Sequence, residues 1–370
     1  MSSLEARWPT LAGNASDRVL SICLLEATAL AQGLDIVRIN GTSFVAGRAP
    51  WFNTLGFWGP LSSETSRNAV RITRDRVKRK AALTASGIRV PQSRRFSYSQ
   101  IDEAIAYGKR FRGGVIIKPW ALSAGRVSLN GLTDPADMRK AITAWQQTPE
   151  NGGGFLVEGR IYGPEYVFYV VRDQVHSVVR RRNRVWAEEI YRHGRDRNSE
   201  IDPGVLGLAV DALRAIPRTP FGEVRIRGRN ALMDPSRCRV VSVRATLEPV
   251  TGPSPREWSS SLADLLISQS TQRATGELVA VPHSRVTAEV SATELPRAES
   301  FVAKVNSWLA QGPIAGDLQA EDRRLRGSLT GTPGELASFS QMMRTRKLIS
   351  ETPQTVTLIQ SAQSERRTDG

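Results

Sequence analysis

Lys118 directly follows an apolar run, a position from which its side chain can contact the phosphate of a bound ligand. Residues 114–117 have the β-branched composition of a buried strand, and Lys118 comes next. A short loop of small and polar residues, 123–126, lies a few positions further on. A lysine held at a strand end can contact phosphate oxygens, and a loop with Ser123 and Gly125 lets backbone N–H groups approach the same oxygens. The pattern favours a nucleotide site, with an exposed lysine before a turn as the alternative.

Arginine dominates the charge of the chain. There are 51 basic and 36 acidic residues, a net charge of +15, and all but seven of the basic residues are arginine. The densest cluster, Arg180, Arg181, Arg182 and Arg184, follows a strand-like run. It carries no helix-turn-helix, zinc-finger or RNA-recognition signature, and no aromatic stripe interleaves the charge. Nucleic-acid or anionic-polymer binding is therefore a remote alternative, and a carboxylate-bearing substrate suits the arginines better.

Hydrophobic periodicity and turn residues predict an α+β chain. Expected helices cover residues 19–32, 73–86, 101–112, 135–146, 205–215, 258–268, 298–311 and 335–343. Expected strands cover residues 35–39, 115–117, 127–129, 155–157, 166–171, 176–181, 223–227, 239–243, 285–291, 324–328 and 355–359. Asp134 is the expected N-cap of the helix at 135–146, and Gly87 the C-terminal cap of the helix at 73–86. The expected organisation is an N-terminal α/β segment (1–72), a main module (73–260, with subdomains 73–153 and 154–260) and a small C-terminal α/β domain with a charged tail (261–370).

Residues 75–251 carry a series of motifs that resembles the ATP-grasp superfamily. The segment 75–91 (DRVKRKAALTASGIRVP) looks like the family's entry helix, and Lys118 resembles its phosphate-contacting lysine. The segment 155–166 (FLVEGRIYGPEY) resembles the hinge strand that binds adenine through its backbone, followed by the family's E, G, E pattern. Within the superfamily, the chain is most similar to peptide ligases and cyanophycin-synthetase-like enzymes, which activate a carboxylate as an acyl phosphate and pass it to an amine.

The resemblance implies an ATP-grasp-like fold in which two α/β subdomains enclose a nucleotide cleft. ATP is the implied cofactor, and an amino acid or short peptide the implied substrate. The implied roles are phosphate contacts for Lys80 and Lys118, adenosine contacts for Leu156, Val157 and Glu158, a place in the E, G, E pattern for Glu165, and stabilisation of the acyl phosphate for Arg180 and Arg182. Alternating Phe155 and Val157 can enclose a flat ring. The alternatives are ion pairs for the two glutamates and an exposed basic strand face for the two arginines.

The resemblance fails where the family supplies carboxylates for magnesium. The matching segments are FGEVR at 221–225 and VSVRA at 241–245. The expected aspartate falls on Val224 or Arg225, Ser242 occupies the expected glutamate, and Arg244 the expected asparagine. Arginines at these positions repel metal ions and compete for the phosphates. Three alternatives follow: Glu223 or Glu248 replaces the missing ligands, the arginines replace the metal charge, or the chain is a degenerate subunit that binds a peptide or an active homologous partner.

Other features of the sequence point to no chemistry. Cys23 and Cys238 lie in apolar stretches and are expected to be buried thiols, and the three histidines, His176, His193 and His283, are too scattered for a metal site. The first residues lack a leader pattern and no apolar run reaches the length of a membrane span, so a cytoplasmic protein is expected. The C-terminal domain is a candidate for homodimerisation.

Overall fold

The computed structural model describes residues 17–40, 43–47, 54–119, 129–146, 154–181, 187–194, 201–229, 232, 234–248, 257–275, 285–293, 295, 297–331, 335–336, 339 and 355–360. The chain forms two compact units. The terminal unit comprises Met1–Ser63 with Glu248–Gly370, and the central unit Glu64–Leu247. Among the described helices, none combines the length and the apolar character that crossing a bilayer requires.

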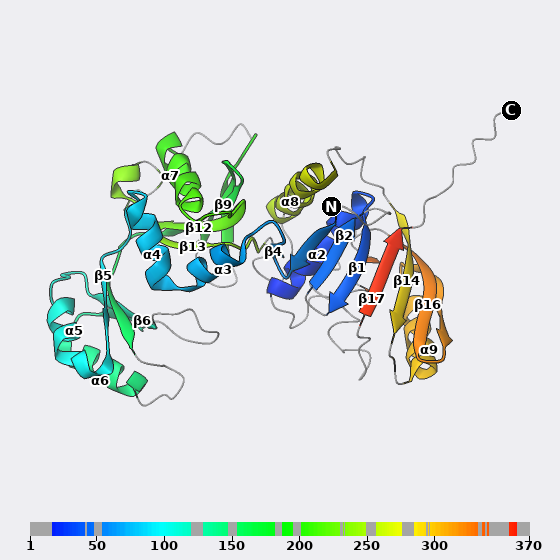
Figure 1. Ribbon diagram of the computed structural model, residues 1–370, viewed down its shortest axis with the longest axis horizontal. Helices are drawn as coiled ribbons and strands as arrows, with labels where there is room; N and C mark the ends of the chain where they lie inside the picture. Colours follow the sequence, from blue (N-terminus) through cyan, green and yellow to red (C-terminus); the bar gives the residue numbers. More distant parts are fainter. Residues whose placement is uncertain are drawn as a thin grey trace. The chain divides into compact units, whose positions relative to one another are not determined.

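The terminal unit is built on one antiparallel sheet of eight strands, in the order β15-β16-β14-β17-β1-β2-β3-β4 (Figure 1). Its elements are α2 (Asp17–Ala31), β1 (Asp35–Asn40), β2 (Ser43–Gly47), β3 (Leu55–Trp58), β4 (Leu61–Ser62), α8 (Glu257–Thr275), β14 (Val286–Thr293), α9 (Ala298–Leu309), β15 (Ala315–Glu321), β16 (Arg324–Gly331) and β17 (Thr355–Gln360). Strand β17 pairs with β1 on one side and β14 on the other. This pairing joins the predicted N-terminal segment and the predicted C-terminal domain in a single unit, because their strands hydrogen-bond in one sheet.

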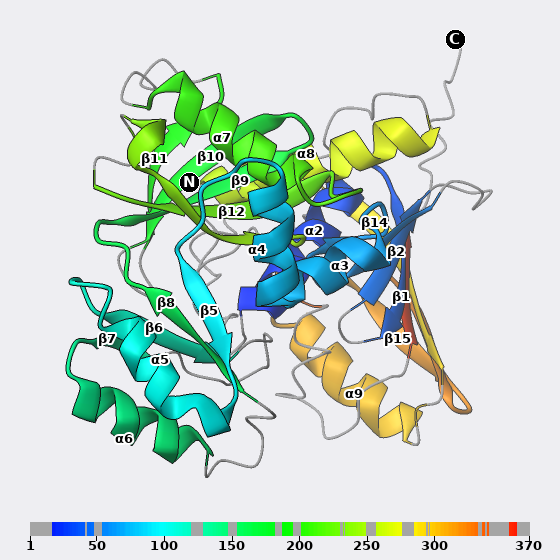
Figure 2. The same cartoon turned by 60° about the vertical axis from the view of Figure 1, so that its left-hand side comes forward.

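The central unit contains two antiparallel sheets, β5-β8-β6-β7 and β11-β10-β9-β12-β13. Its elements are α3 (Arg67–Arg74), α4 (Arg76–Ala85), β5 (Ser93–Phe96), η1 (Tyr98–Gln100), α5 (Ile101–Gly108), β6 (Val115–Pro119), β7 (Leu129–Leu132), α6 (Pro135–Gln146), β8 (Phe155–Gly159), β9 (Glu165–Val171), β10 (Gln174–Arg181), β11 (Ala187–Arg192), α7 (Pro203–Arg214), β12 (Phe221–Arg227), η3 (Pro235–Arg237) and β13 (Arg239–Arg244). Helices α5 and α6 accompany the four-stranded sheet, and α7 packs on the five-stranded one (Figure 2). Because β8 pairs with β5 and β6, the first subdomain extends to Gly159 rather than ending at residue 153.

The helix expected at residues 73–86 is broken at Asp75. Asp75 has extended backbone angles, and its side chain accepts hydrogen bonds from the N–H groups of Val77 and Lys78, so it is the N-cap of α4. Gly87 follows the C-cap residue with a φ of +74°, which confirms the predicted glycine cap. The predicted cap Asp134 is likewise confirmed, since it accepts from the N–H of Ala136 at 2.7 Å.

Several strands carry no clear sequence signal. β2, β3, β11 and β15 were not among the expected strands, and β15 is largely polar and exposed. Such strands form because a neighbouring strand offers its hydrogen-bonding edge, which local composition does not encode. The predicted helix 335–343 lies mostly outside the described residues.

Candidate functional site

A cavity of about 310 Å³ in the central unit is lined by residues of both sheets and of α4. Six cationic side chains line it, together with two carboxylates, one serine and three aliphatic side chains. The cationic residues are Arg76, Arg79, Lys118, Arg225, Arg227 and Arg244, and the others are Glu158, Glu165, Ser242, Ile116, Ile161 and Val241. We call this cavity the arginine pocket. The excess of positive charge suits an anionic ligand.

The first wall of the arginine pocket comes from β6 and β8. In the register of these strands, Lys118 lies opposite Leu156 and Ile116 lies opposite Glu158. Because directly opposite residues share a face and neighbours along a strand alternate, these four side chains share one face of the sheet. Leu156 is 3% exposed and is not among the residues that line the pocket.

Val157 and Phe155 occupy the opposite face of β8. Both are fully buried, in a core shared with residues of α5 and α6. The backbone of β8 is paired on both sides, with β5 and with β6. The side-chain contact with adenine predicted for Val157 therefore has no place in the arginine pocket. The aliphatic side chains in the pocket are Ile116, Ile161 and Val241.

The turn between β8 and β9 requires a glycine. Gly163 has a φ of +113°, and a Cβ atom at this position would lie 2.2 Å from the carbonyl oxygen of Gly228. No other residue type fits such a contact without moving the backbone. This close approach holds the turn containing Ile161 against the end of β12, and it explains the glycine of the E, G, E pattern.

Glu158 holds two lysines from different elements. One carboxylate oxygen accepts from Lys80 of α4 and the other from Lys118 of β6. The Glu158 side chain is only 4% exposed. Burial alone raises the pKa of Glu158, but the charges of Lys118 and Lys80 outweigh this effect and lower the pKa overall. Glu158 is therefore an anion at neutral pH, fixed between two cations.

The two lysines differ in the donors that they have left. Lys80 also donates to the carbonyl oxygen of Pro91 at 2.9 Å and to the Ser93 hydroxyl at 2.8 Å, so its three N–H donors are all used. Lys118 has one hydrogen bond within the described part of the chain, to Glu158. Within the described residues, Lys118 thus has N–H donors left for a ligand, whereas the donors of Lys80 serve the protein itself.

The second wall comes from β12 and β13. Glu223, Arg225 and Arg227 are spaced by two along β12, so they share one face of the sheet. Glu165 of β9 lies directly opposite Arg227 and is on the same face. Arg227 pairs with Glu165 at 2.8 Å, and Arg225 with the same carboxylate at 3.6 Å. Arg225 also pairs with Glu223 at 3.4 Å, and Arg244 approaches Glu223 at 3.9 Å.

This second wall does not fit a magnesium ion. Mg²⁺ prefers oxygen ligands, usually one or two carboxylates. Ser242 and Arg244, at the positions where the sequence resemblance predicts metal ligands, offer no carboxylate, and Glu223, 2% exposed, is already paired with arginine. Among the described residues, no group of three or more His, Cys, Asp or Glu side chains could hold a metal. The other predicted replacement, Glu248, belongs to the terminal unit and is not in the pocket lining.

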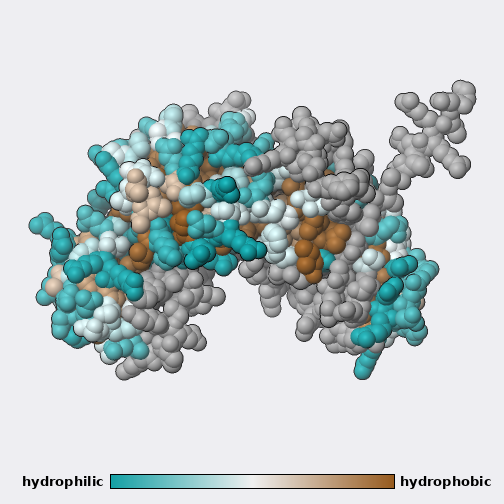
Figure 3. Space-filling view, viewed as in Figure 1, coloured by the Kyte–Doolittle hydropathy of each residue, from teal (hydrophilic) through white to brown (hydrophobic). Residues whose placement is uncertain are grey.

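Three pocket arginines were not predicted as site residues, namely Arg227 of β12 and two arginines of α4. Arg76 and Arg79 are three positions apart on α4, so they share a face of the helix. Arg79 is 4% exposed, and its Nη1 donates to the carbonyl oxygen of Thr73 at 2.6 Å. Burial, and then the neighbouring charge of Arg76, lower the pKa of Arg79 to about 10. The spacing of three between Arg76 and Arg79, directly after the N-cap Asp75, could have predicted that both side chains lie on one face of the helix. The outer side of α3, with Arg67, Arg71 and Arg74 exposed, is also hydrophilic (Figure 3).

The structure does not bring Arg180 to the arginine pocket. In the strand register, Arg180 of β10 lies opposite Tyr166 of β9, and Tyr166 lies opposite Ile226 of β12. Tyr166 and Ile226 belong to the core on the face of the sheet that points away from the arginine pocket. Because side chains alternate, Arg180 is on that face and not on the face of Arg225. Arg182, Ser123 and Gly125 lie outside the described residues, so their predicted roles stay predictions.

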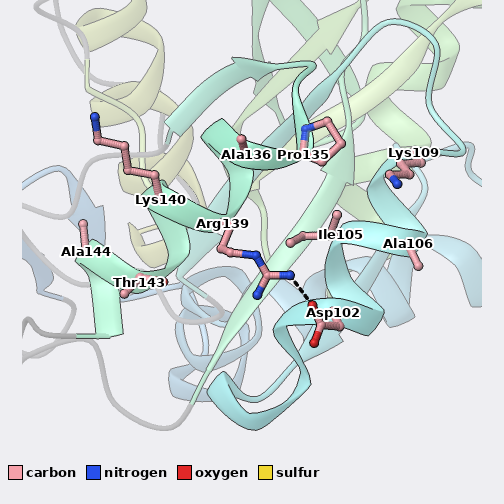
Figure 4. A pocket seen from close by; sticks show the side chains of 10 residues that line it. All are labelled: Asp102, Ile105, Ala106, Lys109, Pro135, Ala136, Arg139, Lys140, Thr143 and Ala144. Carbon is pink, nitrogen blue, oxygen red and sulfur yellow. Dashed lines mark hydrogen bonds and ion pairs between the residues drawn. The ribbon is translucent and has the colours of Figure 1, made fainter.

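A second hollow lies between α5 and α6 (Figure 4). It is lined by Asp102, Ile105, Ala106, Lys109, Pro135, Ala136, Arg139, Lys140, Thr143 and Ala144. Its arginine is paired with Asp102, and both side chains are more than half exposed. Exposed ion pairs of this kind contribute little energy, and nothing else in this groove singles out a ligand.

Comparisons with known proteins point to one class. No family model matches the chain. The glutathione biosynthesis bifunctional protein GshAB of Mannheimia succiniciproducens is 30% identical over 128 residues, which are 33% of this chain and 16% of that protein. The match thus spans about a sixth of the relative's length.

Solved structures with a similar arrangement are also ligases. A bifunctional glutathione synthetase from Pasteurella multocida matches 63% of this chain and 42% of its own, at 14% identity and a TM-score of 0.41. The ATP-grasp ligase PsnB, bound to a precursor peptide and AMPPNP, matches 56% and 61%, at 20% identity and 0.38. A RimK domain ATP-grasp protein from Sphaerobacter thermophilus matches 54% and 68%, at 19% identity and 0.39. At TM-scores below 0.5 these structures say nothing about individual residues here. The chain resembles ATP-grasp ligases, with peptide ligases among its structural neighbours.

Proposed function

We propose that the central unit binds ATP in the arginine pocket and that the chain is a carboxylate–amine ligase, which activates an amino acid or short peptide as an acyl phosphate. The observation that carries this proposal is the convergence of Lys118 and five arginines on one cavity that also has three aliphatic lining residues. Cations of this kind bind phosphates, and aliphatic side chains can enclose a base. The sequence match to a glutathione biosynthesis protein supports the same class of reaction.

In the proposed complex, adenine lies among Ile116, Ile161 and Val241, and the phosphates extend towards Lys118 and the arginines. Glu158 keeps Lys118 in place through its ion pair. A carboxylate has lone pairs beyond the two that Glu158 uses for lysine, so it can also accept from a ribose hydroxyl.

The proposed reaction has two steps. A carboxylate oxygen of the substrate attacks the terminal phosphorus of ATP, and the bond from that phosphorus to its bridging oxygen breaks to release ADP. The amine then attacks the acyl carbon, phosphate leaves, and the nitrogen loses a proton to give the amide. Arginine forks on the second wall stabilise the charge of the transferring phosphoryl group. Arg225 and Arg244 are better placed for this task than the predicted Arg180.

Calorimetric titration with ATP tests the nucleotide site. Lys118→Ala removes a phosphate donor and should weaken ATP binding by about tenfold or more. Lys80→Ala should instead lower the free energy of unfolding by roughly 1–3 kcal/mol, because its donors serve the protein itself. Lys140→Ala, a lysine of the groove between α5 and α6, is the matched control and should change neither quantity. Equal ATP affinity in Lys118→Ala and the control would remove the basis of the proposal. ADP release with amino acids and peptides then tests the ligase step.

A second candidate function is supported by the carboxylate-poor second wall. A chain that holds ATP or a peptide without catalysis would serve as a binding subunit for a second copy or for an active homologous partner. Nucleotide binding without ADP release, for any carboxylate and amine tried, is the outcome that favours this candidate.

A further inference from the structure

We propose that the arginine pocket binds the phosphates of its nucleotide directly through arginine, without a divalent metal, and that Mg²⁺ weakens binding instead of supporting it. This inference rests on the proposed nucleotide site. It starts from the second wall, where a metal pair would need available carboxylates and the two that are described, Glu165 and Glu223, are each paired with arginine.

Unused donors at the pocket point to an anionic ligand. The Nε atoms of Arg79, Arg225 and Arg227 are buried and have no acceptor within the described part of the chain. All three arginines line the cavity, and Arg79 is 4% exposed. A buried donor without an acceptor is costly, so such donors mark a place where a ligand supplies oxygens. Phosphate oxygens match the fixed fork of an arginine.

The balance of charge favours a free nucleotide over its magnesium complex. Among the described residues, six cationic side chains line the cavity and three carboxylates, Glu158, Glu165 and Glu223, lie in or beside it, so positive charges outnumber negative ones there. Magnesium neutralises part of the charge of a polyphosphate and adds a cation that these arginines repel. A site that contains its own cations therefore loses attraction for the ligand when the ligand arrives already neutralised.

The arrangement of the arginines is part of the fold. Arg225 lies opposite Ser242 and Arg244 opposite Glu223 in the pairing of β12 with β13. Glu223 joins the two guanidinium groups from one side. The ion pairs orient these arginines before any ligand binds, so less conformational freedom is lost on binding.

The test uses the full chain, with ATP and with inorganic tripolyphosphate, which lacks the base. Each ligand is titrated by calorimetry in EDTA and in excess MgCl₂ at the same ionic strength. Binding in EDTA should be tighter than in MgCl₂ by about tenfold. Arg244→Gln, at a side chain that is 37% exposed and thus safe for folding, should weaken tripolyphosphate binding in EDTA by about tenfold and reduce the magnesium effect. Arg237→Gln, 65% exposed and outside the pocket lining, is the control and should bind like the unmodified chain.

The possible failures are distinguishable. ATP binding that requires Mg²⁺ would overturn the metal-free inference and leave the proposed nucleotide site intact. No binding of ATP in either condition would overturn the nucleotide site as well. Equal weakening by Arg244→Gln and Arg237→Gln would show that the ligand senses only the net charge of the surface, which also contradicts a built site.

Discussion

The two walls of the arginine pocket differ in how their cationic side chains are paired with carboxylates. On the first wall, one buried carboxylate, Glu158, faces two lysines and holds both. On the second wall, arginines of β12 and β13 share Glu165 and Glu223, and two further arginines of α4, Arg76 and Arg79, line the same cavity. The first wall thus balances its two lysines around one carboxylate, whereas arginines outnumber carboxylates among the described residues of the second wall.

The difference indicates that the second wall suits an anion. Arg225 and Arg227 face the cavity, because their neighbours Val224 and Ile226 belong to the core on the other face of the sheet. The register of β12 with β9 is regular here, whereas that of β12 with β13 shifts between Arg225 and Ile226. If this comparison is right, disrupting the first wall costs stability above all, and changing the second wall mainly alters ligand affinity.

The largest effect is expected for Glu158→Gln. Its loss leaves Lys80 and Lys118, 14% and 18% exposed, without their shared counter-charge. Removing one partner of a buried ion pair typically lowers the free energy of unfolding by about 3–5 kcal/mol. Urea denaturation at neutral pH measures this change, and Glu103→Gln, 56% exposed, is the control with an expected change within about 0.5 kcal/mol. A loss no greater than that of the control would show that the first wall is not held together by Glu158.

A smaller loss of stability, with a gain in affinity, is expected for Glu223→Gln. The substitution removes a negative charge between Arg225 and Arg244, so the free energy of unfolding should fall by about 2–3 kcal/mol. Tripolyphosphate in EDTA should bind about fivefold tighter or more, since less of the cationic charge is neutralised. Calorimetry measures the affinity, and Glu189→Gln, a carboxylate paired with Arg192 on β11, is the control. If Glu223 were instead a metal ligand, the same variant would lose binding that depends on magnesium.

The first wall could be predicted from local sequence. The apolar run before Lys118 and the segment containing Glu158 are strands, and the strand register places both residues on one face. Part of the second wall was also accessible, because Glu223, Arg225 and Arg227 are spaced by two and must share a face of β12. The strand register also places Arg180 on the face away from Arg225, which the sequence alone did not indicate, since a shift by one residue turns a strand side chain to the opposite face.

Long-range pairing was not accessible from local patterns. The strand signal at β17 is clear, but nothing in it says that β17 inserts between β14 and β1, which lies near the other end of the chain. Arg76 and Arg79 line the pocket from α4, which begins after the break at Asp75. This break depends on the N-cap hydrogen bonds that the Asp75 side chain accepts. These features arise from tertiary contacts, which composition does not specify.

The smallest effect is expected for His176, which lies outside the arginine pocket and should cause part of the loss of stability at acid pH. Burial, then the charges of Arg192 and His193, lower the pKa of His176 on β10 from its ordinary value of 6.5 to about 4. Because the folded chain holds this histidine neutral, its contribution to stability is complete above pH 6.5 and is lost as the pH falls towards 4. At pH 5 the loss should be less than about 1 kcal/mol, since His176 is partly exposed to solvent. His176→Gln should reduce the fall in Tm between pH 7 and pH 5 more than His193→Gln does, because the second variant removes only one of the charges that lower the pKa of His176. An NMR titration in which His176 protonates near pH 6.5 would contradict this assignment. Any fall in Tm at acid pH would then come from the protonation of carboxylates. Because the pKa of Glu158 is lowered, this carboxylate stays charged and stabilising to a lower pH than an ordinary glutamate.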